Sequence, residues 1–231
     1  MPIGTITNVA TVLVGTVIGA MAGTRFPERV RETVMATLGL ATAAIAVREI
    51  LPTEEFPLVL GAVLLGALLG EAMRIEAGLH LLGAFLQRVV AGDGDTPRGN
   101  ARMGEGFVIA SLVFCVGPLT IVGSIQDGLG DAELLLVKAA LDGFAAIAFA
   151  AVYGWGVGFS ALTVLLIQGG IALGAGTLDG ILTDPMIDAL GAAGGILLLG
   201  IALRLLDLKQ VRVANLLPAV VLAPIFVGWW G

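Results

Sequence analysis

The sequence predicts an all-α integral membrane protein with about eight transmembrane helices. Hydrophobic residues make up 58% of the 231 residues and charged residues only 13%, against about a quarter charged in an ordinary soluble domain. The mean hydropathy is +1.01. Apolar runs of about 18–20 residues, long enough for a helix to cross the hydrocarbon core, recur along the whole chain. These observations predict a chain that passes repeatedly through a bilayer.

Three apolar runs precede the longest polar segment. They cover about residues 3–22, 33–50 and 56–73. Apolar residues then recur at helical spacing over about 74–90, and polar side chains such as Glu76 and His80 fall on other faces. This pattern predicts an amphipathic helix on the cytoplasmic surface of the membrane. A flexible polar linker rich in glycine and aspartate is expected to follow over residues 91–103.

Five further apolar runs complete the chain, and we assign all eight to a single transmembrane domain over residues 1–231. In the fourth run, Gly117-Pro118 is expected to break the helix, because proline removes a backbone hydrogen bond. The last run ends in Trp229-Trp230, an aromatic pair typical of a membrane interface. The five runs cover about residues 104–124, 133–152, 159–176, 186–204 and 213–230.

Basic residues predict the orientation, because cytoplasmic loops of membrane proteins carry an excess of lysine and arginine. Arg48 lies on the opposite side from the other loop cations, and Lys138 lies within span five. We therefore expect loops one, three, five and seven in the cytoplasm and both termini outside. The ten cations that follow spans one, three and seven are Arg25, Arg29, Arg31, Arg74, Arg88, Arg98, Arg102, Arg204, Lys209 and Arg212.

Glycine accounts for 34 residues, about twice its usual share. Small residues four apart, such as Gly15 and Gly19, let helices approach closely. Packing within the chain and a homo-oligomer face are both open interpretations. A weak repeat relates Thr37–Ala41 to Ala189–Ala193, so that spans one to three would match spans six to eight. The loop charges give the two halves opposite directions, which is the inverted repeat common among transporters.

The candidate site centres on Lys138 and Asp142, which lie four residues apart on one helical face and can pair directly. Ionisable residues within a membrane are costly and usually face a cavity or one another. Three interpretations are open. The pair is gated or linked to proton movement, it is a structural clamp, or Lys138 reaches outward to the membrane interface.

Other polar residues extend this candidate path. A break at Pro118 leaves the carbonyl near residue 114 without its helical donor, and exposed carbonyls can bind cations. Gln168, near the middle of span six, can bind a substrate or another helix. Asn8 and Asn215 are expected to cap or bridge helices, and Asp127-Gly128 to form an external turn. The predicted path residues are Asp142, Lys138, Gly117, Pro118, Thr120, Ser124, Gln126 and Gln168.

Several classes of protein are excluded or not expected. Cys115 is the only cysteine and His80 the only histidine, so an intrachain disulfide, a CxxC motif and an HExxH motif are ruled out, and no Ser-His-Asp arrangement is recognisable. The net charge of −6 comes without a basic patch of the nucleic-acid-binding type. An enzyme and a cofactor are not expected, and metal binding is left open.

Six segments together resemble a known family, the bacterial uncharacterised membrane proteins of the YqgA/YdfK type. The resemblance runs over nearly the whole chain. It implies a multi-pass protein of the prokaryotic plasma (inner) membrane, and it implies no activity and no binding residues. The segments are Gly4–Asn8, Phe114–Pro118, Gly123–Gly128, Lys138–Gly143, Gln168–Gly170 and Val213–Pro218.

The expected function is a membrane transporter or channel for a small ion or small polar solute, with a polar site between spans four, five and six. Polar and helix-breaking residues cluster in these consecutive spans. The alternative is a non-transport scaffold or sensor subunit that acts through helix–helix contacts. The expected partners are the lipid bilayer and the small ion or solute; a homo-oligomer is left open, and no nucleic acid is expected.

Cysteine labelling in a Cys115→Ala background tests the predicted orientation. Because the loop charges place residue 95 in the cytoplasm, Asp95→Cys should be protected from a membrane-impermeant maleimide in intact cells. Trp230→Cys, at the opposite side, should react. Selective labelling of residue 95 from outside would show that the orientation is reversed.

Overall fold

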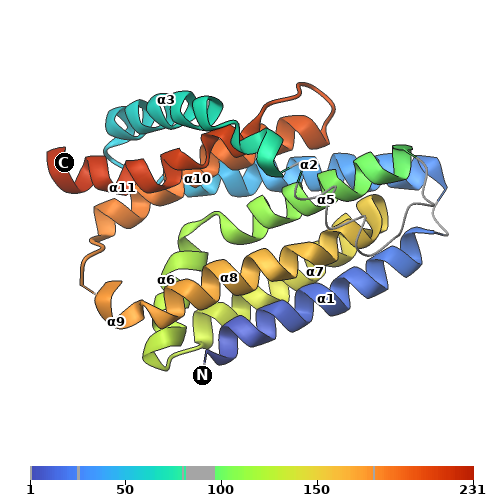
Figure 1. The fold of residues 1–231 in the computed structure, drawn as a ribbon, viewed down its shortest axis with the longest axis horizontal. Coiled ribbons are helices and arrows are strands. Elements are labelled where there is room, and N and C mark those ends of the chain that lie inside the picture. Colours follow the sequence, from blue (N-terminus) through green and yellow to red (C-terminus); the bar gives the residue numbers. More distant parts are fainter. Residues whose placement is uncertain (1, 25–26, 80, 82–96, 179) are drawn as a thin grey trace. The chain divides into compact units, whose positions relative to one another are not determined.

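The computed structural model describes residues 2–24, 27–79, 81, 97–178 and 180–231, and only the backbone of residues 97–102. These residues form helices and turns, with no strand among them (Figure 1). Within these described ranges, six helices are long and apolar enough to cross a membrane, or seven if one bent pair counts as a span. The all-α membrane class predicted from the sequence is therefore confirmed.

The chain divides into two compact units, which we describe separately. The first unit is built from residues 1–34, 79–115 and 119–178. Its elements are α1 (Ile3–Gly23), α5 (Pro97–Cys115), α6 (Pro118–Leu129), α7 (Glu133–Tyr153), the 3₁₀ segment η1 (Gly154–Phe159), α8 (Ser160–Leu173) and the short α9 (Ala175–Leu178).

The first unit is organised around the contact between α1 and α7. Gly15, Gly19 and Gly23 of α1 lie against the backbone of α7, where a β-carbon on any of them would overlap a carbonyl oxygen. The opposing carbonyls belong to Gly143, Ile147 and Ala151. Small residues at this spacing allow two helices to approach backbone to backbone. At these three positions the glycine spacing serves packing within the chain.

The expected break in the fourth span is confirmed. Helix α5 ends at Cys115, α6 begins at Pro118, and the two helices are bent by 65°. Gly117 has a φ of 142°, a conformation that L side chains rarely adopt. Proline suits the first turn of a helix because its missing N–H has no partner there. Gly117 therefore makes the turn and Pro118 starts the new helix.

Helices α7 and α8 correspond to the expected spans 133–152 and 159–176. By length and hydropathy they count as one apolar run, Glu133–Leu173. Gly154, with a φ of 75°, caps α7, and the 3₁₀ segment η1 separates it from α8. Both helices pack on α1. The count of eight spans stays a prediction.

The second unit is built from residues 35–78, 116–118 and 179–231. Its core is formed by small residues, such as Ala62 of α3, Ala192 of α10 and Ala223 of α11, which are completely buried. Such side chains leave the helix backbones close together. The elements are α2 (Glu28–Ile50, in this unit from Met35), α3 (Phe56–Met73), α10 (Asp184–Leu205), the 3₁₀ segment η2 (Val213–Leu216) and α11 (Pro218–Trp230).

Several expected boundaries differ from the structure. Helix α5 begins at Pro97, inside the expected linker 91–103 and before the expected start at 104, because proline is favoured in a first helical turn. The expected last span, 213–230, begins with η2 and becomes α-helical only at Pro218. Of the expected amphipathic helix 74–90, residues 75–79 and 81 are helical; His80 and residues 82–96 lie outside the described residues.

The α1–α7 contact predicts opposite effects of two glycine-to-alanine changes. Gly19→Ala should destabilise the protein by about 1–3 kcal/mol, because the added carbon overlaps the Ile147 carbonyl. Gly170→Ala in α8 is the matched control, since no atom beyond its own stretch of helix lies within 4 Å of its β-carbon position. It should be neutral or stabilising, because alanine favours the helix. Thermal unfolding of the purified variants measures both; equal effects would contradict the packing argument.

Candidate polar site

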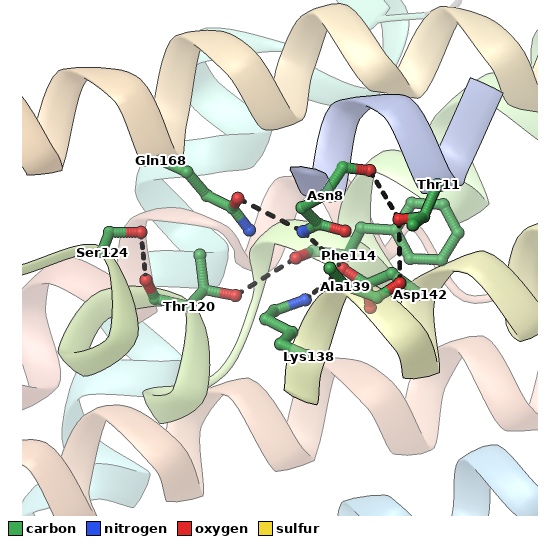
Figure 2. A network of polar contacts seen from close by, with 9 residues as sticks. All are labelled: Asn8, Thr11, Phe114, Thr120, Ser124, Lys138, Ala139, Asp142 and Gln168. Carbon is green, nitrogen blue, oxygen red and sulfur yellow. Dashed lines mark hydrogen bonds and ion pairs between the residues drawn. The ribbon is translucent and has the colours of Figure 1, made fainter. Parts of the chain in front are cut away.

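Three helices of the first unit meet at a network of polar side chains. Asn8 of α1 donates through Nδ2 to Asp142 Oδ2 of α7 at 2.9 Å, and to Gln168 Oε1 of α8 at 3.2 Å. Lys138 Nζ lies 2.5 Å from the same Asp142 oxygen. Figure 2 shows the Asn8 side chain between Gln168 and the Lys138–Asp142 pair. The network therefore joins α1, α7 and α8.

Helical spacing explains how these side chains meet. Lys138 and Asp142 are four residues apart, so they lie on one face of α7. Gly143 follows, and a β-carbon on it would press against Thr11 of α1. On α1 the buried face repeats every three or four residues through Thr5, Asn8 and Val12. The close approach of α1 and α7 brings Asn8 within reach of the carboxylate.

The network is buried. Asn8 and Gln168 have no exposed surface, and Lys138 and Asp142 are each 7% exposed. Each charge of the pair compensates the other, so the site is neutral as a whole. Removing one member of a buried pair leaves an uncompensated charge, which costs about 3–5 kcal/mol in soluble proteins. The expected direct pairing of Lys138 and Asp142 is present in the structure.

Two buried atoms of the network lack a hydrogen-bond partner. They are the acceptor Asn8 Oδ1 and the donor Gln168 Nε2. An unsatisfied buried polar group costs about 1–3 kcal/mol, so proteins rarely keep one without a reason. The two atoms lie where α1 meets α8 beside the ion pair, so the network keeps one acceptor and one donor unsatisfied there.

Thr11 is a member of the network that sequence reasoning missed. Its hydroxyl oxygen lies 2.9 Å from the Asn8 carbonyl oxygen and 2.8 Å from the Ala139 carbonyl oxygen. The hydroxyl therefore links α1 to α7 directly beside the ion pair. Its position one helical turn after Asn8 and four residues before Gly15 was the available signal, because this spacing places all three residues on one face.

A threonine hydroxyl of α6 satisfies a backbone group at the helix break. In a continuous helix the Phe114 carbonyl would accept a bond from the N–H of residue 118, which proline lacks. Thr120 Oγ1 donates to this carbonyl at 3.1 Å, and Ser124 Oγ donates to the Thr120 carbonyl at 2.5 Å. Figure 2 shows Thr120 between Ser124 and Phe114. The Thr120 hydroxyl therefore replaces the bond that Pro118 cannot make, whereas the Ser124 hydroxyl bonds within α6.

The remaining predicted site residues make none of this network's hydrogen bonds. Gly117 and Pro118 belong to the second unit, where the Pro118 ring lies against Gly191 of α10. Gln126 is partly buried on α6, and none of the network's hydrogen bonds includes it. The structure therefore joins Lys138, Asp142 and Gln168 and does not bring Gln126 to them.

The expected external turn at Asp127-Gly128 is wrong. Both residues lie inside α6, and Asp127 is 4% exposed. Its Oδ1 accepts the Gly4 N–H at 2.8 Å, and its Oδ2 accepts the N–H and hydroxyl of Thr5 at 2.9 and 3.0 Å. Helix α1 has no side-chain cap from Pro2. Asp127 supplies this cap, with a negative charge at the positive end of the helix.

A second polar cluster lies in the other unit and is held together by Asn215. Asn215 Nδ2 donates to Glu71 Oε2 at 2.6 Å, and its Oδ1 accepts the Glu76 N–H at 2.7 Å. Arg212 pairs with Glu71, and Arg204 with Glu76 at 2.9 Å. The expected bridging role of Asn215 is therefore present. Both side-chain amide atoms are satisfied, so the cluster is an anchor between α3, the residues that follow it, and η2.

Among the residues that the structure describes, no group of three or more histidine, cysteine, aspartate or glutamate side chains could hold a metal ion. Cys115, a free thiol, is partly buried at the end of α5.

The apolar helices and the buried ion pair define a helical integral membrane protein. The chain belongs to the family described as "Protein of unknown function (DUF554)", which matches residues 3–228. It is 33% identical to the "Uncharacterized protein YqgA" of Escherichia coli (strain K12), over 99% of this chain and 98% of that protein. It is 28% identical to the "Uncharacterized membrane protein YdfK" of Bacillus subtilis (strain 168), over 97% of this chain and 95% of that protein. No solved structure matches the chain.

Removing the Thr120 hydroxyl tests its role at the break. Thr120→Val leaves the buried Phe114 carbonyl without its donor and should destabilise the protein by about 1–3 kcal/mol. Thr7→Val is the matched control, because the Thr7 hydroxyl makes a similar 2.8 Å bond to the Ile3 carbonyl at an exposed position. Unfolding midpoints in detergent provide the measurement. If the two variants lose equal stability, the Thr120 bond has no special role at the break.

Proposed function

We propose that this protein is a transporter or channel for a small ion or small polar solute. The observation that supports this function is the buried ion pair together with the two side-chain amides beside it. One atom of each amide, Asn8 Oδ1 and Gln168 Nε2, has no hydrogen-bond partner. Polar groups inside a membrane protein are expensive, and they commonly mark the path of a substrate or proton. Asn8, Lys138, Asp142 and Gln168 form the binding site of this path.

The broken span supports the same function. Discontinuous helices commonly line the binding sites of secondary transporters, because unwound backbone is tolerated only where it is buried or faces a cavity. Here the break between α5 and α6 is stabilised by Thr120, a residue of the same compact unit as the ion pair.

The protein resides in the prokaryotic plasma membrane with both termini outside, and it is not an enzyme.

A scaffold or sensor subunit is the second candidate. It is supported by an open apolar groove of about 490 Å³ along α1 and α7. Large side chains such as Val14, Ile18 and Phe144 line this groove and are exposed. A second helix could pack there without any flux of solute. Measuring flux therefore separates the two functions.

Flux into proteoliposomes tests the transport function. Asp142→Asn should reduce both stability and flux, because Lys138 loses its counter-charge. Asp131→Asn, at an exposed aspartate of the same unit, is the matched control and should change neither. Because Lys138→Met with Asp142→Asn removes both charges, the double variant should regain stability while flux stays lost. The assay uses ²²Na⁺, ⁸⁶Rb⁺, ³⁶Cl⁻ and a pH-sensitive dye in turn.

One outcome would contradict the role of the ion pair, and a second would contradict transport itself. Full flux in a stable double variant would show that the pair is only a structural clamp. Absence of flux for every probe in folded wild-type protein would favour the scaffold or sensor subunit.

A further inference from the structure

The ion pair engages one oxygen of Asp142. Lys138 Nζ and Asn8 Nδ2 both approach Oδ2, at 2.5 and 2.9 Å, and neither bond uses Oδ1. The lysine ammonium therefore occupies a position that a free cation would take beside this carboxylate. Because Lys138 is attached to the same helix, it acts as a tethered competitor for that position.

The Asn8 amide can present either a hydrogen-bond donor or an acceptor to the cluster. Its Nδ2 lies 2.9 Å from Asp142 Oδ2 and 3.2 Å from Gln168 Oε1, whereas its Oδ1 is buried without a partner. A rotation of the amide by about 180° exchanges the two atoms. Three oxygens would then converge, one each from Asn8, Asp142 and Gln168. Such oxygens repel one another unless a cation lies among them.

The charge of the site selects the kind of cation. One carboxylate, Asp142, is balanced by one ammonium, and the surrounding residues Val12, Ala139 and Ala146 are apolar and buried. A single positive charge can replace Lys138 without leaving excess charge in this environment. A divalent ion would leave excess charge, and such ions usually draw on several carboxylates. An anion would be repelled by Asp142.

We propose that the Asn8–Asp142–Gln168 cluster binds a monovalent alkali cation through oxygen atoms, in competition with the ammonium group of Lys138. This inference rests on the proposed transport function and names the class of its substrate. When the cation enters, Lys138 leaves Asp142, and its long side chain can turn toward the polar start of α7 at Glu133. The exchange conserves the charge of the site.

The proposal predicts that removing a positive charge strengthens cation binding. The apparent affinity of a site falls by the fraction of molecules in which the site is competent to bind. Lys138→Met removes the competitor, so the Na⁺ concentration that half-saturates the site should fall by about tenfold or more relative to wild type. The measurement is the thermal unfolding midpoint of purified protein in NaCl, LiCl or KCl, against choline chloride at equal ionic strength and fixed pH.

Three further variants provide the controls. Asp142→Asn should abolish the difference between alkali and choline salts, and Asn8→Leu should weaken it, because each removes an oxygen of the cluster. Lys209→Met removes an exposed lysine of the second unit and should respond to the salts as wild type does. Lys138→Gln is a second variant of the competitor and should also bind Na⁺ more tightly than wild type.

Other results would overturn the proposal. If choline chloride raises the unfolding midpoint of every variant as much as the alkali salts do, the ion pair is a structural clamp. If only pH changes the midpoints, the guest is a proton. If Lys138→Met and Lys138→Gln fail to fold in every salt, no cation replaces the ammonium. If another solute is transported but alkali salts do not raise the unfolding midpoint, this inference is rejected and transport stays intact. If alkali ions bind but no solute is transported, transport alone is rejected.

Discussion

The structure depends on one constraint, which is that a polar group within the hydrocarbon region must find its partner inside the protein. The first unit meets this requirement in three ways. Asp142 and Lys138 neutralise each other, the Thr120 hydroxyl satisfies the carbonyl left free by Pro118, and Asp127 satisfies the first amides of α1. Against this background Asn8 Oδ1, Gln168 Nε2 and Arg31 Nε lack a partner, and the first two belong to side chains that meet at the ion pair.

Glycine makes the network possible. Because Gly15, Gly19 and Gly23 have no β-carbon, α1 lies against the backbone of α7, and Asn8 reaches Asp142 at 2.9 Å. Larger side chains at these positions would push the two helices apart. These three glycines therefore support the polar network as well as the packing. The same close approach lets Thr11 reach the Ala139 carbonyl.

The sequence predicts those features that depend on neighbouring residues. The break at Gly117-Pro118 and the pairing of Lys138 with Asp142 follow from local chemistry and helical spacing. The roles of Asn8, Thr11 and Asp127 depend on contacts between helices that are more than 120 residues apart in the chain. Asp127-Gly128 has the composition of a turn, but burial against the first turn of α1 keeps it helical. Spacing along one helix cannot indicate which distant helix will lie beside it.

The cap that Asp127 provides also has a consequence for biosynthesis. The Gly4 N–H and its acceptor are separated by 123 residues, so α1 emerges from the ribosome long before the carboxylate that completes its first turn. Until α6 is synthesised, these amides need water or lipid headgroups as partners, since hydrocarbon offers none. We therefore expect the beginning of α1 to stay at the membrane surface until α6 is present to complete its first turn.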